Sequence, residues 1–311
     1  MRHLRMLGLC VAAVLAVTAV TASSALAAVK NPTKGLTIFK NCPVHVTEVE
    51  GKPVETVQCV FGATESGAGG QFTVGGITVP LSKQIVLQYG IAIVNNGYGE
   101  AYAPPTHGVE AIAPTPENVP GEPIAHITAA EQEELGWPET LKYSYAQAQK
   151  HGLVKKATET IELAGIPVTN KGNIVFEEGV GLEAPVKIKA GNAWLSALGT
   201  VCYIGSDAEP IVQHLTSGET TSPLTSEKLH GFSGELDIFH AGEEAWLTHS
   251  VLLDNTYAVP GASCTGPYSA QIAATIDKEF HIPQPAGASV TEVKSTLYVG
   301  GKQLVEHRLG L

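Results

Sequence analysis

The sequence predicts a mainly β protein made of β-sandwich-like regions, with a few short helices and disulfide bonds. Short runs rich in β-branched and aromatic residues recur along the chain, and Gly, Pro and Asn separate them. This pattern is typical of all-β sandwiches and barrels. The 33 Gly and 19 Pro, together with only 16% charged residues, also favour many strands joined by turns.

Residues 1–27 have the parts of a secretory signal peptide. Arg2 and Arg5 form a basic start, residues 6–20 are almost wholly apolar, and Ala-Leu-Ala at 25–27 supplies small residues before a cleavage site. The apolar run is shorter than the roughly 20 residues that span a bilayer, which disfavours a membrane anchor. We therefore expect a soluble protein without an integral membrane segment after cleavage, either secreted and extracellular or associated with the cell envelope.

An N-terminal β region is expected over residues 28–102. Val44 and Val46 alternate with His45 and Thr47, so one face of that strand is apolar and the other polar. The expected strands are GLTIFK, VHVTEVE, VETVQCVF, QFTVGGITVPL (two strands that join at Gly75 and Gly76) and KQIVLQYGIAIV.

Residues 103–152 form the expected connector, and its first part carries six prolines. Thr128 begins the sequence TAAE, a capping-box pattern that ends at Glu131. A second helix is expected to start near Pro138 and to end at Gly152.

A C-terminal β region is expected over residues 153–311, interrupted by one helix near 266–280. The strands are expected in TETIELAG, NIVFEEG, APVKIKAG, LGTVCYIG, PIVQHLTSG, ELDIF, AWLTHSVLLD and STLYVGGKQLVEHRL. The helix carries an apolar stripe along one side, which predicts packing against the core. The stripe consists of Tyr268, Ile272, Ile276 and Phe280, with Ala273 beside it.

Four cysteines lie beyond the expected signal peptide, and an even number in an exported chain indicates disulfides. Cys42 and Cys59 flank a short apparent hairpin, which favours a local bridge. Cys202 would then pair with Cys264 and hold the expected helix against a sheet. Three connectivities remain open. The cysteines are too far apart in sequence for the close pairs of a structural zinc site.

The charge of the chain disfavours anionic partners. Its formal net charge is −11, and Arg308 is the only arginine outside the expected signal peptide. Nucleic-acid binding needs a basic surface, and phosphate recognition relies heavily on arginine. We expect no nucleic-acid partner. The actual partner is unknown, and neutral or cationic molecules, a cell-envelope component or a second copy of the chain are the candidates.

The glycine-rich segment GATESGAGGQ has the spacing of a phosphate-binding loop at Gly62 and Gly67. Ala68 and Gly69 stand where such a loop has Lys and a hydroxyl residue, and a strand pattern follows where a helix is needed. The segment therefore predicts a turn between strands and no nucleotide cofactor.

Candidate catalytic and metal-binding residues are sparse. Ser233, Asp237 and His240 are of the three residue types that form a catalytic Ser-His-Asp triad. Three residues within one short segment, however, rarely reach the geometry that such a triad needs. His240 and His249 could face each other across neighbouring strands, although such residues are more often polar surface groups. We expect no catalytic residue, no metal and no cofactor.

The acidic doublets at 177–178 and 243–244 suggest the paired carboxylates of a glycosidase. Because adjacent residues on a strand point to opposite faces, each doublet would need a second carboxylate from elsewhere. A further candidate is a sugar-binding platform, although tryptophans in a β sandwich more often belong to the core. Its residues would be Trp137, Trp194, Trp246, Tyr98 and Tyr102.

Several segments resemble a group of exported proteins from soil actinobacteria that has no established activity. The resemblance rests on CPVHV, GGQFTVGGITVPLSKQIVLQYG, TIELAG, APVKIKAG, LLDNTYAVPGASC and, most specifically, CYIGSDAEPIVQHLTSG. It implies an exported β protein with disulfides and assigns no catalytic residue.

The sequence thus predicts a non-catalytic binding or structural protein. The alternatives are a secreted hydrolase and a binding module for carbohydrate or apolar small molecules. An apolar cavity between sheets would favour a binding module for apolar small molecules. A cleft in which Glu, His or Ser side chains converge would favour the hydrolase. A self-complementary exposed sheet edge would favour a structural protein that assembles.

Overall fold

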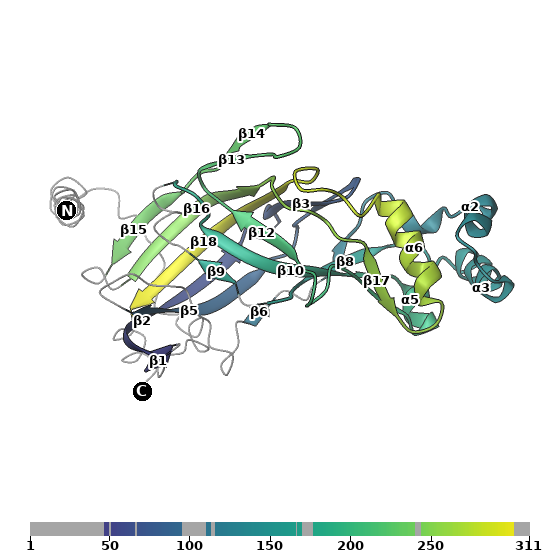
Figure 1. Cartoon of the computed structure of the whole chain (residues 1–311), viewed down its shortest axis with the longest axis horizontal. Coiled ribbons are helices and arrows are strands. Elements are labelled where there is room, and N and C mark those ends of the chain that lie inside the picture. Colours follow the sequence, from purple (N-terminus) through teal and green to yellow (C-terminus); the bar gives the residue numbers. More distant parts are fainter. Residues whose placement is uncertain are drawn as a thin grey trace. The chain divides into compact units, whose positions relative to one another are not determined.

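The computed structural model describes residues 47–49, 51–65, 67–94, 110–112, 116–165, 167–169, 177–239 and 244–301. These residues form two large antiparallel sheets, one two-stranded sheet and a few short helices (Figure 1). The predicted mainly β fold class is therefore confirmed.

The first sheet has nine strands: β1 (Glu48–Val49), β2 (Lys52–Thr64), β3 (Gly70–Val74), β4 (Ile77–Pro80), β5 (Val86–Val94), β6 (Glu110–Ile112), β15 (Glu235–Phe239), β16 (Glu244–Asp254) and β18 (Thr291–Gly301). The main order is β15–β16–β18–β2–β5–β6, while β1 pairs with β2 and β3 pairs with β18 and β4. Since Leu297 of β18 lies opposite Gly62 of β2, strands from residues 28–102 and from residues 153–311 share this sheet.

The second sheet has seven strands: β7 (Glu117–Asn118), β8 (Thr158–Leu163), β9 (Val168–Thr169), β10 (Leu182–Gly191), β11 (Val201–Ile204), β12 (Ile211–Leu215) and β17 (Ala262–Thr265). Strand β10 pairs with β8, β9, β11 and β12. A bridge between Thr216 and Leu253 joins the end of β12 to β16 of the first sheet. The small sheet is formed by β13 (Glu219–Thr221) and β14 (Lys228–His230).

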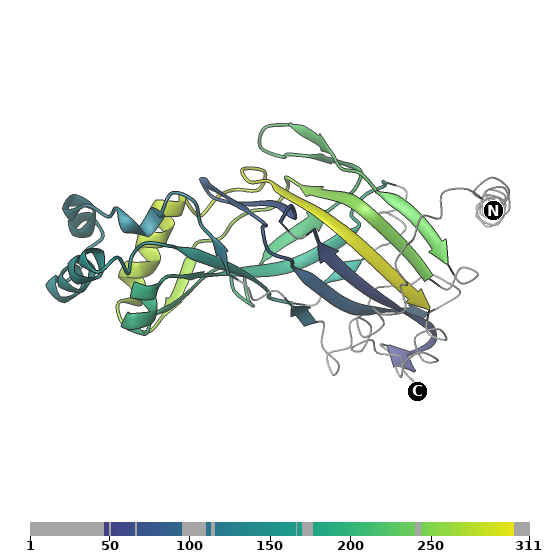
Figure 2. The same cartoon turned by 180° about the vertical axis from the view of Figure 1, so that it is seen from behind.

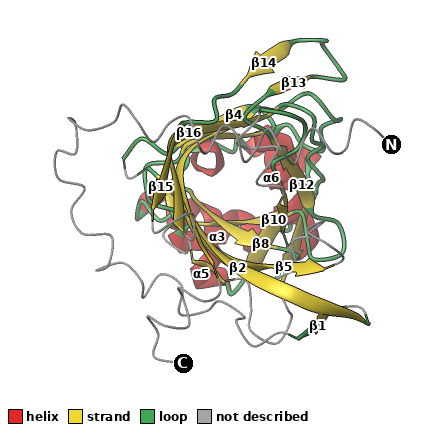
Figure 3. Cartoon of the chain, turned by 90° about the vertical axis from the view of Figure 1, so that its left-hand side faces the viewer, coloured by secondary structure: helices red, strands yellow, loops and turns green. Residues whose placement is uncertain are grey.

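Strands of both sheets surround a common interior, which Figure 3 shows from one end. Strand β10 shows how the sequence directs side chains there, because Ala184, Val186, Ile188 and Ala190 are buried while Lys189 is exposed. Alternation of this kind places every second side chain on the same face of a sheet. The apolar positions of the strands therefore build the interior.

The helices of the described residues gather at one end of the sheets (Figures 1 and 2). They are η3 (Pro123–Ala125), α2 (Ala129–Glu134), α3 (Glu139–Lys150), α5 (Ala193–Leu198) and α6 (Ser269–Phe280). The capping box at Thr128 and Glu131 is confirmed, and α3 begins just after Pro138. Helix α5 was not expected. Its start is fixed by Asn192, whose side-chain oxygen accepts a 2.8 Å hydrogen bond from the N–H of Leu195.

Helix α6 confirms the predicted apolar stripe. Ile272, Ile276 and Phe280 are buried, and Tyr268 is the N-cap residue rather than part of the helix. Cys264 precedes this helix in the sequence and was expected to pair with Cys202. It lies on β17, directly opposite Cys202 of β11. These two cysteines form a disulfide with a Cα–Cα distance of 4.1 Å, so β17, the strand that leads into α6, is covalently attached to β11, its neighbour in the second sheet.

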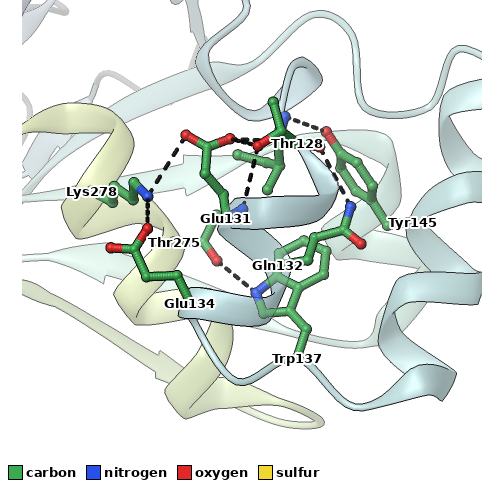
Figure 4. Close-up of polar contacts among 9 residues, drawn as sticks. Thr128, Glu131, Gln132, Glu134, Trp137, Tyr145, Thr275 and Lys278 are labelled. Atoms are coloured by element: carbon green, nitrogen blue, oxygen red, sulfur yellow. Dashed lines mark hydrogen bonds and ion pairs between the residues drawn. The ribbon is translucent and has the colours of Figure 1, made fainter.

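An aromatic cluster joins the helices to the core. Tyr145 contacts Trp137 and Trp194 edge-on, with ring centroids 5.3 Å and 5.1 Å apart. The indole N–H of Trp137 donates to the hydroxyl of Thr275 in α6 at 3.1 Å, and Lys278 of α6 pairs with Glu134 at 2.6 Å (Figure 4). Burial of the rings, with their polar atoms hydrogen-bonded, anchors α6 beside α2 and α3.

Within the described ranges, no helix has both the length and the apolar character needed to cross a membrane. Several sequence predictions lie outside these ranges. They are the signal peptide at 1–27, the strand GLTIFK, Cys42, most of the strand VHVTEVE including Val44, His45 and Val46, Tyr98, Tyr102, most of the strand NIVFEEG, His240, Glu243 and the end of the last strand at 302–311.

Candidate functional site

A cavity of about 150 Å³ lies between the two sheets. The first sheet contributes lining residues from β2, β3, β16 and β18, and the second contributes them from β8, β10 and β12. Most of the lining is aliphatic: Ala63, Leu81, Ile85, Ile161, Leu163, Leu182, Ala184, Val186, Leu215, Leu252, Val293 and Leu297, with Phe72 as the only aromatic side chain among the described lining residues.

The strand pattern explains why these side chains converge. On β12, Ile211, Gln213 and Leu215 are buried and point to one face, while the intervening residues are half-buried. Across the pair to β10, Ala184 lies opposite Gln213 and Leu182 lies opposite Leu215. The small side chain of Ala184 leaves room beside Gln213, because an alanine fills little of the space between two sheets.

Four polar lining residues already have hydrogen-bond partners. Ser250 and Ser295 pair through their hydroxyls at 2.9 Å, and Ser250 also donates to the carbonyl of Ser295 at 2.9 Å. The hydroxyl of Thr64 accepts from the N–H of Ile85 at 2.8 Å, and that of Thr291 donates to the Tyr257 hydroxyl at 3.1 Å. These groups are therefore already satisfied by the protein.

Gln213 differs from them. Its residue is only 2% exposed, and neither its side-chain nitrogen nor its oxygen has a hydrogen-bond partner in the described structure. Buried polar side chains in native proteins nearly always have a partner. Gln213 therefore brings an unused donor and an unused acceptor to an otherwise apolar cavity.

The lining has little charge. Glu162, which is half-buried, is the only ionisable side chain among the described lining residues, and no Lys, Arg or His is among them. Burial of an unpaired charge is costly. The cavity is thus suited to an uncharged molecule.

A buried carboxyl pair lies elsewhere in the second sheet. Glu117 of β7 is directly opposite Glu159 of β8. The carboxylate of Glu117 accepts hydrogen bonds from the Ser82 hydroxyl at 2.6 Å and from the N–H of Lys83. Burial, together with the nearby Glu117, raises the pKa of Glu159 to about 8. Neither Glu117 nor Glu159 is among the residues that line the cavity, so this carboxyl pair does not face a molecule bound in it.

The structure does not assemble a serine triad from the described residues. Ser233 is half-buried, and its backbone N–H donates to the carboxylate of Glu177 at 2.9 Å. This bond keeps the pKa of Glu177 below its usual range. Asp237 is exposed on β15, and His240 lies outside the described ranges.

The histidines are dispersed over the described part of the chain. His249 is exposed, at the bulge of β16, and His214 lies 3.7 Å from Glu183. A ring nitrogen of His230 lies 2.9 Å from the carbonyl of Gly231. Within the described ranges, no three His, Cys, Asp or Glu side chains are grouped as metal ligands.

The proposed sugar platform is not formed by the tryptophans whose side chains are described. Trp137 and Trp194 are 3% and 2% exposed and belong to the aromatic cluster of the core. The first glutamate doublet is separate from the cavity, because neither Glu177 nor Glu178 is among the residues that line it.

The glycine-rich segment continues β2 into the loop before β3. Gly62 lies within β2, and the N–H groups of Gly67 and Gly69 donate to the carbonyls of Ser82 and Leu81. A phosphate loop uses such N–H groups to bind an anion. Here they hold the loop against the strand end after β4.

Gln213 and Glu159, the buried polar residues described above, are not among the candidate residues predicted from the sequence. A signal for both was available. In IVQHL and in TETIEL, the polar residue occupies the same alternating face as neighbouring Ile and Leu residues. A polar residue at a position where the strand pattern requires an apolar one indicates a polar side chain that faces the apolar interior.

Comparisons with protein-family models, with curated proteins and with solved structures give no significant match.

Proposed function

We propose that this protein is a non-catalytic binding protein that holds a small apolar molecule between its two sheets. The observation that carries the proposal is the cavity of about 150 Å³ with aliphatic walls from both sheets. An apolar cavity of roughly this volume takes up molecules of the size of benzene. Ligand sites are typically concave and largely apolar, with a few polar groups that fix orientation.

The same lining makes a hydrolase the weaker proposal. A hydrolase needs a nucleophile or paired acid and base groups that reach the substrate. The hydroxyls of Ser250 and Ser295 bind each other, and the carboxyl pair of Glu117 and Glu159 is outside the cavity.

We place this function outside the cytoplasm. The disulfide between Cys202 and Cys264, and the fact that Cys59 is also disulfide-bonded, support an oxidising compartment. Intact-mass analysis of material from the culture medium tests this proposal: we expect loss of residues 1–27 and two disulfides. Retention of residues 1–27 with free thiols would contradict export.

Isopropylbenzene is a suitable probe for the cavity because it is uncharged and consists of one benzene ring with a short branched alkyl group. We expect saturation-transfer NMR and calorimetry to detect its binding to the full chain. Ala184→Phe places a ring inside the cavity and should weaken this binding at least about tenfold, since it occupies the same space. Ala130→Phe makes the same change on the exposed surface of α2 and should leave binding unchanged. Absence of binding to the unmodified protein would refute the proposed function.

A further inference from the structure

On the basis of the proposed function, Gln213 restricts the chemical class of ligand that the cavity can bind. Its side chain points to the cavity face of β12, between Ile211 and Leu215, and lies opposite Ala184. The residue is 2% exposed, and both polar atoms of its amide lack partners in the described structure.

An unpartnered amide in this position destabilises the folded chain. A buried donor or acceptor without a partner loses its bonds to water and gains none in exchange. Leucine has a similar size and would fill the same position without that loss. The presence of glutamine among aliphatic neighbours is therefore explained if a ligand completes its hydrogen bonds.

The other lining groups restrict what that ligand can be. The hydroxyls of Thr64, Ser250 and Ser295 already have partners, which leaves the amide of Gln213 as the unsatisfied buried polar group among the described lining residues. No cationic side chain is among these residues, so a carboxylate or phosphate would be buried without a counter-charge.

We propose that Gln213 binds the polar head of an uncharged ligand whose body is apolar and about the size of one ring. The side-chain N–H donates to a carbonyl of the ligand, and the side-chain oxygen accepts from an N–H of the same head. A planar head that donates and accepts at once, as a primary amide does, satisfies both atoms of Gln213.

Three probes of matched shape test this assignment. Benzamide offers a donor and an acceptor, acetophenone offers an acceptor only, and isopropylbenzene offers neither. Their dissociation constants are measured by calorimetry for the full chain, for Gln213→Leu and for Gln71→Leu. Gln71 is exposed on β3, so the last variant controls for the chemical change itself. Benzoate serves as the charged probe and should bind more weakly than benzamide to the unmodified chain.

We expect Gln213→Leu to weaken benzamide binding relative to isopropylbenzene by about tenfold or more, with a smaller relative loss for acetophenone. Gln71→Leu should leave all ratios unchanged. If isopropylbenzene binds but Gln213→Leu leaves the benzamide ratio unchanged, water satisfies the amide, and this inference is wrong while the proposed function stands. If no probe binds the unmodified chain, the proposed function itself fails.

The melting temperature of ligand-free Gln213→Leu provides a second measurement. We expect it to equal or exceed that of the unmodified chain, because the variant removes an unsatisfied polar group. A clear fall in the melting temperature would show that Gln213 serves the fold rather than a ligand, and would overturn the inference.

Discussion

Glu159 lies on β8 with only 2% of the residue exposed, and neither oxygen of its carboxyl group has a hydrogen-bond partner in the described structure. Burial is the main reason that its pKa rises to about 8, and the carboxylate of Glu117 adds to the effect. The side chain is therefore protonated at neutral pH in the folded chain and ionised in the unfolded chain. Folding at neutral pH then takes up a proton, which makes stability depend on pH.

Substitution of Glu159 by Gln tests this pH dependence. Because the folded pKa is above the unfolded value of 4.5, the contribution of Glu159 is fully present below pH 4.5 and is lost as the pH rises toward 8. We expect the difference in free energy of unfolding between Glu159→Gln and the unmodified chain to grow by roughly 4 kcal/mol, in favour of the variant, from pH 5 to pH 8.

Urea unfolding at each pH measures this difference. Burial also raises the pKa of Asp277 and Glu279, so the comparison with the variant isolates the share of Glu159. Glu178→Gln makes the same change at an exposed position and should leave the slope unaltered. Parallel pH profiles for Glu159→Gln and the unmodified chain would contradict the raised pKa.

Gly70 shows what the glycine-rich segment does in the fold. Its φ is +101°, and a Cβ atom there would lie 2.0 Å from the carbonyl oxygen of Glu292 on β18. Only glycine permits both the backbone conformation and this close approach. The close contact between β3 and β18 thus explains why glycine occupies position 70, within the segment that resembles a phosphate loop.

At the scale of secondary-structure elements, α6 and β17 form a connected unit. The stripe of Ile272, Ile276 and Phe280 packs into the core, and the disulfide between Cys202 and Cys264 fixes the preceding strand. The two cysteines are separated by 62 positions in the sequence. Cross-linking of a loop of this length restricts the unfolded chain.

Replacement of both Cys202 and Cys264 by Ala should lower the free energy of unfolding by about 2–4 kcal/mol. The reason is the additional conformational freedom of the unfolded chain, so the spectrum of the folded protein should change little. Denaturant unfolding of the variant and of the unmodified, oxidised protein measures the loss. An unchanged free energy of unfolding would show that the bridge does not stabilise the fold.

At the scale of the whole molecule, the described strands of the two β regions depend on each other. Strand β2 pairs with both β5 and β18, and β3 also pairs with β18. The cavity is lined from both sheets, and the bridge between Thr216 and Leu253 connects them. Separation of the regions would therefore break a sheet and expose its apolar face.

We expect the chain to unfold in one cooperative transition because of this shared sheet. In a Trp246→Phe variant, which removes the tryptophan on β16, fluorescence monitors the helical end through Trp137 and Trp194, and far-UV circular dichroism monitors the strands. The two transitions should coincide in urea. Separate midpoints for the two signals would show that the helical end and the sheets unfold independently.

The sequence by itself determined the local elements whose signals lie within a few residues. Strand-type sequence patterns predicted the longer strands such as β2, β10 and β18, but not short ones such as β6, β7 and β13. The hairpin at Gly75 and Gly76 formed as expected, and the capping box fixed the start of α2. The four-residue spacing of Ile272, Ile276 and Phe280 predicted the buried face of α6. These features follow from steric and hydrogen-bonding preferences that act along the chain.

Only the tertiary structure decided which strands pair and what their faces enclose. Pairing of β2 with β18 joins residues from opposite ends of the described chain, and no local pattern specifies that register. The cavity exists because side chains from two sheets meet without filling the space between them. Gln213 becomes a candidate binding residue for the same reason, since the lack of a hydrogen-bond partner is a property of its surroundings and not of its sequence.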